Sequence, residues 1–171
     1  MELLENISEY LKKHELKMAT AESCTAGLIV SELAGIPGSG QSIDCGLAVY
    51  SPEAKNRYLS VSFDTIDTYG LTSEVTSREM ALGALNNNDA NVAIANTGIA
   101  GPKPHADIPV GTVCFAWAFR HAQEVYIIVE TKRFSGDRNE VRLAAAHYAL
   151  EMVPKHHGDV LAGKAPRVDE S

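Results

Sequence analysis

The hydrophobic positions of this chain follow a helical spacing in some segments and an extended spacing in others. Residues 2–14 place Leu4, Ile7 and Leu11 on one face, which is the spacing of an amphipathic helix. Five further helices are expected, and the last of them ends near Val153, before Pro154. These helices are predicted to begin near Leu28, Ser51, Asp64, Ser73 and Asp137.

Extended apolar segments predict strands over residues 17–21, 43–50, 91–96, 110–119 and 124–133. The last two are joined at residues 121–123 and predict an antiparallel hairpin. Because strands otherwise alternate with helices, the sequence predicts an α/β fold, a three-layer α/β/α sandwich on a mixed sheet. We expect one domain over residues 1–153 and a loosely ordered tail over residues 154–171.

Composition limits the classes of function that the chain can have. Its 171 residues include 15 Lys and Arg against 22 Asp and Glu, a net charge of −7. Phosphate contacts along a nucleic acid need clustered basic residues, so we expect no nucleic-acid partner. No apolar run approaches the ~18 residues that span a membrane. Three cysteines without a CxxC pair are typical of reduced thiols, and residues 1–6 lack signal-peptide features, so we expect a soluble cytoplasmic protein.

Ser23 is the first candidate catalytic residue. It lies where a short strand turns sharply into the helix that begins at Leu28. Such a turn exposes a side chain and leaves backbone N–H groups unpaired, here from Cys24 through Thr25 to Gly27, which could hold an oxyanion. The alternative role for Ser23 is an ordinary helix cap. A nucleophilic serine requires a base from elsewhere in the chain.

Lys55 is the best candidate for that base. It lies one turn into the helix that begins at Ser51-Pro52. To accept a proton, its amine needs a pKa lowered from ~10.4 toward ~7–8, which burial near a helix start favours. Tyr50 ends the preceding strand, and its phenol could relay a proton or orient the lysine. The alternatives are a solvated surface lysine and a tyrosine packed in the core.

Two further segments could contact a substrate. Thr97 and Gly98 open a glycine-bearing turn after a predicted strand, where ligand sites of α/β sheets lie. Arg138 falls in the first turn of the last helix, where an anion would meet both its guanidinium and backbone N–H groups. By itself the first segment is only a turn, and Arg138 could instead pair with Asp137 or Glu140.

Other chemistries receive less support from the sequence. Cys24 could be a nucleophile with a histidine base, but the six histidines form no recognisable partner arrangement, so we expect a buried thiol. His156 and His157 have no third ligand at useful spacing, so we expect no metal site. We also expect no cofactor.

Several motifs occur in the order found in one known family. They are Thr-Ala-Glu-Ser-Cys-Thr-Ala-Gly (20–27), Gly-Leu-Ala-Val-Tyr-Ser-Pro-Glu-Ala-Lys (46–55), Thr-Gly-Ile-Ala-Gly-Pro (97–102) and Phe-Ser-Gly-Asp-Arg (134–138). In these motifs the chain resembles the CinA C-terminal domain family of PncC-like nicotinamide mononucleotide deamidases. The resemblance implies an anticodon-binding-domain-like sandwich, often dimeric, so we expect a homodimer.

The resemblance also implies an activity and roles for residues. The family hydrolyses the carboxamide of nicotinamide mononucleotide to nicotinic acid mononucleotide and ammonia, without a metal. Its serine, lysine and tyrosine fall on Ser23, Lys55 and Tyr50, and its substrate contacts fall on Thr97 and Arg138.

The chain departs from the family pattern at Ala26, where a glycine is usual, and after Pro102, where residues 103–108 lack the usual glycines. The altered segment motivates an alternative hypothesis, a non-catalytic relative that binds a nucleotide or a protein. A hydrolase of another small amide is a third hypothesis.

Overall fold

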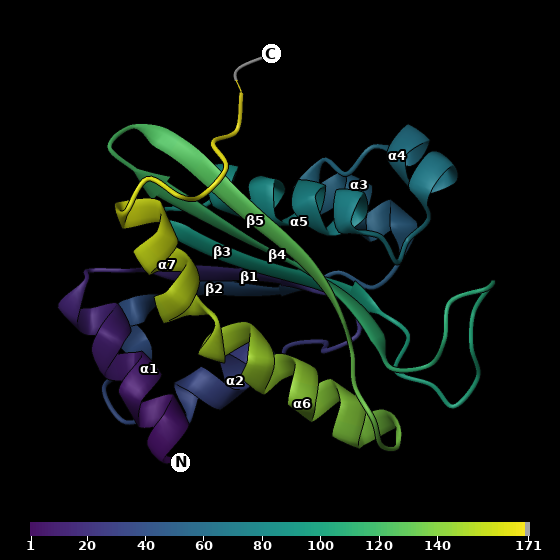
Figure 1. The fold of residues 1–171 in the computed structure, drawn as a ribbon, viewed down its shortest axis with the longest axis horizontal. Coiled ribbons are helices and arrows are strands. Elements are labelled where there is room, and N and C mark those ends of the chain that lie inside the picture. The colour runs from purple at the N-terminus through teal and green to yellow at the C-terminus, as the bar shows by residue number, and fades with distance from the viewer. Residues whose placement is uncertain (170–171) are drawn as a thin grey trace.

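Five strands form one mixed sheet at the centre of the molecule (Figure 1). The computed structural model describes residues 1–169. The strand order is β2-β1-β3-β4-β5, with β1, β2 and β3 parallel and β4 and β5 antiparallel to their neighbours. The strands are β1 (Met18–Glu22), β2 (Ile43–Ala48), β3 (Val92–Gly98), β4 (Thr112–His121) and β5 (Glu124–Arg133).

Helices cover both faces of this sheet (Figure 1). One layer consists of α1 (Glu2–Lys13), α2 (Leu28–Ala34), α6 (Arg138–Glu151) and α7 (Val153–Leu161). The other consists of α3 (Pro52–Leu59), α4 (Phe63–Tyr69) and α5 (Glu74–Asn86). A short 3-10 helix, η1 (Ser39–Ser42), precedes β2. The predicted three-layer α/β/α sandwich on a mixed sheet is confirmed. None of the helices within residues 1–169 is long and apolar enough to cross a membrane.

The two faces of the sheet differ in side-chain size because large and small residues alternate along the strands. On the α6 side, Ile94, Phe115 and Trp117 form a core of bulky side chains. On the α5 side the strands present mainly alanines, which let α5 lie close to the sheet. The Trp117 indole N–H donates to the carbonyl oxygen of Ala149 at 2.8 Å, so its polar atom is satisfied within the core.

Two of the helix starts that the sequence predicts are confirmed by their capping contacts. The Ser51 hydroxyl accepts a hydrogen bond from the backbone N–H of Ala54 at 3.0 Å, with Pro52 in the first turn. At α6, Asp137 and Glu140 form a complete capping box. These local signals fix where the helices that carry Lys55 and Arg138 begin.

The expectation of a loosely ordered tail from residue 154 was wrong for most of that segment. Pro154 lies in the first turn of α7, where proline is tolerated because its missing N–H has no helical partner. That helix buries Val153, His156, His157 and Val160 against the sheet and α1. Residues 166–168 then bond to β5, with the N–H of Val168 donating to the carbonyl of Val125 at 2.8 Å. Residues 170–171 of the predicted tail lie outside the described residues.

A pair of substitutions on α7 tests this packing. Val160 is 3% exposed and the adjacent Leu161 is 49% exposed. Val160→Ala is expected to lower the free energy of unfolding by about 1–3 kcal/mol because it removes buried apolar surface and leaves a cavity. Leu161→Ala should change it by no more than about 0.5 kcal/mol. Urea unfolding of the two variants measures both values, and equal effects would contradict the packing of α7.

Candidate active site

The chain turns sharply after β1, and Ser23 lies at this turn. The Ser23 N–H donates to the carbonyl of Asn96 on β3 at 3.1 Å, and the Ser23 carbonyl accepts from the N–H of Ala26 at 3.1 Å. Ala26 and Gly27 have φ values of +49° and +98°, which lie in the left-handed region that favours glycine. The side chain of Ala26 is exposed, so the methyl group that departs from the family pattern does not crowd the interior.

The Glu22 carboxylate holds this turn in place through hydrogen bonds. It is fully buried and accepts five hydrogen bonds at 2.7–3.3 Å. The donors are two hydroxyls and three backbone N–H groups, from Thr20, Thr25, Gly27, Ile29 and Val30. The N–H groups at the start of α2 are therefore taken by the protein's own carboxylate.

This arrangement removes the Gly27 N–H and the Thr25 hydroxyl from the possible substrate contacts. The N–H of Gly27 bonds to Glu22, and the Thr25 hydroxyl is buried between Glu22 and the Asn96 amide, which donates to it at 2.7 Å. Neither Thr25 nor Gly27 lines the adjacent pocket. The sequence shows that N–H groups stand at a helix start, but not that an acidic side chain already occupies them. The Gly27 N–H and the Thr25 hydroxyl support the turn instead.

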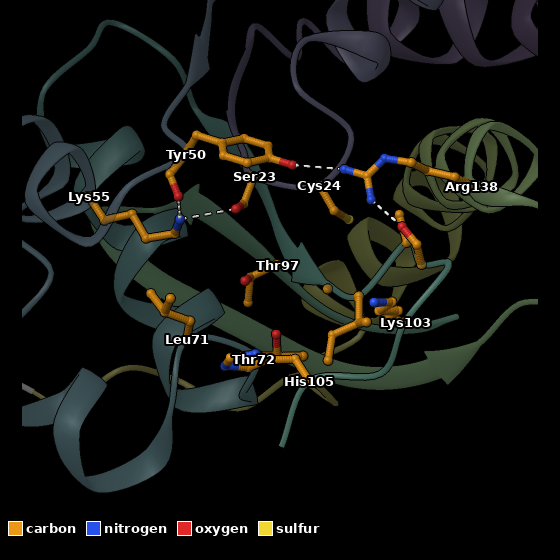
Figure 2. Close-up of a pocket in the computed structure, with 14 residues that line it drawn as sticks. Ser23, Cys24, Tyr50, Lys55, Leu71, Thr72, Thr97, Lys103, His105 and Arg138 are labelled. Carbon is orange, nitrogen blue, oxygen red and sulfur yellow. Dashed lines mark hydrogen bonds between the residues drawn. The ribbon is translucent and has the colours of Figure 1, made fainter. Parts of the chain in front are cut away.

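Ser23 and Lys55 meet directly. The Lys55 ammonium nitrogen lies 3.0 Å from Ser23 Oγ (Figure 2). It also donates to the carbonyl oxygens of Val49 at 3.0 Å and Tyr50 at 2.8 Å. The Lys55 side chain is 1% exposed, so the alternative of a solvated surface lysine is wrong.

The surroundings of Lys55 suit a neutral amine. Burial lowers the pKa of Lys55 to about 8. Two of its three hydrogen-bond partners are carbonyls, which can only accept. The third partner, Ser23, carries a hydroxyl that can donate. A neutral amine that gives its two hydrogens to the carbonyls therefore directs its lone pair at the Ser23 proton.

Tyr50 contributes differently from the prediction. Its backbone carbonyl orients Lys55, while its phenol oxygen accepts a hydrogen bond from the Arg138 guanidinium at 3.1 Å (Figure 2). The ring is 59% exposed, so it is not packed in the core either. The expected phenol relay to Lys55 is therefore not the arrangement of this structure, because the phenol is drawn to the arginine.

A cavity of about 360 Å³ opens beside the Ser23–Lys55 pair, within the size range of small-molecule sites. Thr97 projects into it near the pair (Figure 2). Of the predicted site residues, seven line this cavity: Ser23, Cys24, Tyr50, Lys55, Thr97, Gly98 and Arg138. The other lining residues, none of them among the predicted site residues, are Leu71, Thr72, Ile99, Ala100, Gly101, Lys103 and His105.

Arg138 bridges two parts of the cavity wall. Its guanidinium donates to the carbonyl of Gly101 and to the Tyr50 phenol. Its acidic neighbours are engaged with α6 itself, since Asp137 caps two N–H groups and Glu140 accepts from the N–H of Asp137. The alternative that Arg138 pairs with Asp137 or Glu140 is therefore wrong.

Three supporting residues escaped the sequence analysis. Glu22 and Asn96 face each other in the register of β1 and β3, and Asn96 also accepts from the Cys24 thiol at 3.3 Å. Arg142 on α6 donates to the carbonyls of Cys24 at 2.9 Å and Thr25 at 3.2 Å. The sequence did offer a signal for Glu22 and Asn96, because each is a polar residue near the end of a buried strand. The sequence offered no such signal for Arg142, because the two carbonyls that it holds at the turn belong to residues more than 100 positions away.

Cys24 is unsuited to be the nucleophile. Burial raises the pKa of its thiol to about 12, although the nearby Arg142 opposes that shift. The thiol therefore stays protonated near neutral pH, when the thiolate is the reactive form. Within the described part of the chain, no three His, Cys, Asp or Glu residues gather as metal ligands.

Known proteins are similar to this chain in both sequence and fold. Nicotinamide-nucleotide amidohydrolase PncC of Enterobacter agglomerans is 42% identical over 151 residues, 88% of this chain and 90% of the relative. The Escherichia coli K12 protein of the same name is 39% identical over 152 residues, with 88% and 90% covered. A CinA-like protein of Chloroherpeton thalassium is 42% identical over 156 residues, 90% of this chain, which spans only 37% of that longer relative.

A solved structure, the competence/damage inducible protein CihA from Agrobacterium tumefaciens, superposes with a TM-score of 0.85 at 39% identity. The match covers 91% of this chain and 94% of that one. The family model described as CinA C-terminal domain matches residues 1–156. The chain therefore belongs to the CinA C-terminal domain family.

Proposed function

We propose that this chain is an amidohydrolase that converts nicotinamide mononucleotide and water to nicotinic acid mononucleotide and ammonia, with Ser23 as nucleophile and Lys55 as base. The observation that carries the proposal is the buried Lys55 amine, 3.0 Å from Ser23 Oγ at the edge of a cavity. The two relatives named as nicotinamide-nucleotide amidohydrolases support the substrate.

The first step is attack on the carboxamide carbon. The neutral Lys55 amine accepts the hydroxyl proton while Ser23 Oγ forms a bond to that carbon, giving a tetrahedral adduct and a lysine ammonium. The carbonyls of Val49 and Tyr50 hold the amine in place throughout, because they accept hydrogen bonds from it in either protonation state. About a tenth of the molecules hold a neutral lysine at pH 7 when its pKa is about 8.

The Cys24 N–H and the Thr97 hydroxyl are the donors that we assign to the oxyanion. Among the described residues, the N–H groups at the turn that have no hydrogen-bond acceptor are those of Cys24 and Thr25, and Cys24 also lines the cavity. The Thr97 hydroxyl approaches the same space from β3 (Figure 2). A well-aligned donor of this kind contributes about 3–4 kcal/mol to transition-state stabilisation.

Collapse of the adduct releases ammonia. The Lys55 ammonium returns its proton to the departing nitrogen as the carbon–nitrogen bond breaks, which leaves an ester on Ser23. A water molecule then gives a proton to the neutral Lys55 and attacks the ester carbon. Lys55 finally returns a proton to Ser23 Oγ as the acid product leaves. Each residue ends in its starting state.

Removal of either reacting group should abolish turnover without unfolding the protein. Ser23→Ala and Lys55→Met are each expected to lower kcat/KM for nicotinamide mononucleotide by at least about a thousandfold, because the nucleophile or its base is lost. Ammonia release measures the activity, and circular dichroism verifies the fold.

Ser8→Ala is the matched control for these variants. Ser8 is also buried, lies on α1 away from the cavity, and its hydroxyl has no hydrogen-bond partner among the described residues. This variant should keep full activity. If the folded wild type binds nicotinamide mononucleotide but releases no ammonia from it, the chain is instead the non-catalytic relative that the sequence left open.

The pH profile should report the Lys55 amine. The active form is the neutral one, so kcat/KM should fall about tenfold per pH unit below the pKa of about 8 and level off above it. Initial rates between pH 6.5 and 9.5 test this, a range in which the substrate phosphate, with a second pKa of about 6, is largely ionised. A profile that is already flat from pH 7 to 9 would exclude Lys55 as the base.

A further inference from the structure

The charged side chains around the cavity all carry the same sign. Apart from Lys55, the basic residues that line it are Lys103, His105 and Arg138. None of the residues described as lining the cavity is acidic, although the whole chain has 22 acidic residues against 15 Lys and Arg. The cavity is therefore a basic region in an acidic protein, as expected for a site that takes an anion.

Lys103 and His105 belong to the segment that joins β3 to β4. The segment projects from the body of the molecule (Figure 1), and both side chains are exposed. The two ends of the segment are fixed next to the strands, because the Gly101 carbonyl accepts from Arg138 and the N–H of Gly111 donates to the carbonyl of Ile99 at 2.7 Å. A further hydrogen bond, from the N–H of Ile108 to the carbonyl of His105 at 3.1 Å, closes a turn at its far end.

The charged Lys103 and Arg138 side chains lie apart from Ser23 and Lys55. Figure 2 shows Lys103 and Arg138 on the side of the cavity opposite Lys55, with Thr97 between. Neither Lys103 nor Arg138 has a salt-bridge partner among residues 1–169. Their charges are available to a ligand whose anionic group lies at some distance from the bond that breaks.

The α2 start, a common place for a phosphate, is closed to the substrate. Its N–H groups bond to the buried Glu22 carboxylate, and a second anion there would be repelled. An anionic substrate must therefore be held by side chains elsewhere in the cavity. The Lys103, His105 and Arg138 side chains are the groups that can do so.

We propose that Lys103 and His105, together with Arg138, form an anion clamp that binds the phosphate of the substrate. On this assignment Lys103 determines specificity, because it makes the site prefer a phosphorylated pyridine nucleoside to the same nucleoside without a phosphate. The clamp rests on the proposed function, since it names the residues that hold one end of that substrate. A lysine suits the role because its ammonium acts as a point charge on a flexible stem.

Calorimetric binding to Ser23→Ala protein, which cannot turn over, separates recognition from chemistry. Nicotinamide mononucleotide is titrated into this background with and without Lys103→Ala, and nicotinamide riboside is the ligand that lacks the phosphate. Lys103→Ala should weaken binding of the nucleotide about tenfold and leave binding of the riboside unchanged. His105→Ala should weaken nucleotide binding in the same selective way. Both residues are exposed, so the fold should be retained.

Lys13→Ala is the matched control, because it removes the same charge from an exposed position on α1 that does not line the cavity. It should leave the affinity for the nucleotide unchanged. Equal affinity of the nucleotide with and without Lys103, equal weakening of nucleotide and riboside, or no binding of the nucleotide at all would overturn the clamp. Selective weakening by Lys103→Ala, in a wild type that releases no ammonia, would support the clamp and overturn only the proposed hydrolysis.

Discussion

A buried carboxylate at the end of β1 is the interaction on which the site depends. Glu22 gathers two hydroxyls and three N–H groups around one side chain, and the turn that carries Ser23 passes directly over it. Hydrogen bonds to charged groups contribute about 1.5–3 kcal/mol each, and buried donors without a partner are costly. The positive φ values of Ala26 and Gly27 are tolerated because these bonds hold the backbone there.

The polar groups of this turn face in two directions. Three N–H groups at the start of α2 bond to the Glu22 carboxylate, whereas Ser23 and Cys24 face the cavity. Arg142 fixes the turn from the opposite side through the carbonyls of Cys24 and Thr25. Lys55 reaches Ser23 from α3 because β1 and β2 are adjacent parallel strands whose carboxyl ends meet at one edge of the sheet. Ser23 is thus placed by the sheet and supported by helices of both layers.

Features set by neighbouring residues could be predicted from the sequence, and those set by distant ones largely could not. The amphipathic α1, the Ser51-Pro52 start and the Asp137–Glu140 capping box depend on residues within a turn of one another. The Ser23–Lys55 contact was predictable because both follow strand ends. The direction of the Tyr50 phenol was not, since it depends on Arg138, 88 residues away. Pro154 indicated the end of a helix, although proline is equally compatible with the beginning of one.

Helix α6 joins both ends of the cavity through side chains one helical turn apart. Arg142 holds the backbone next to Ser23, and Arg138 holds Gly101 where the segment that carries Lys103 begins. A helix hardly stretches, because its rise of about 1.5 Å per residue is set by its hydrogen bonds. The distance between the turn that carries Ser23 and Gly101 is therefore nearly constant. On the proposed mechanism, the site selects ligands by the distance between their amide and their anionic group.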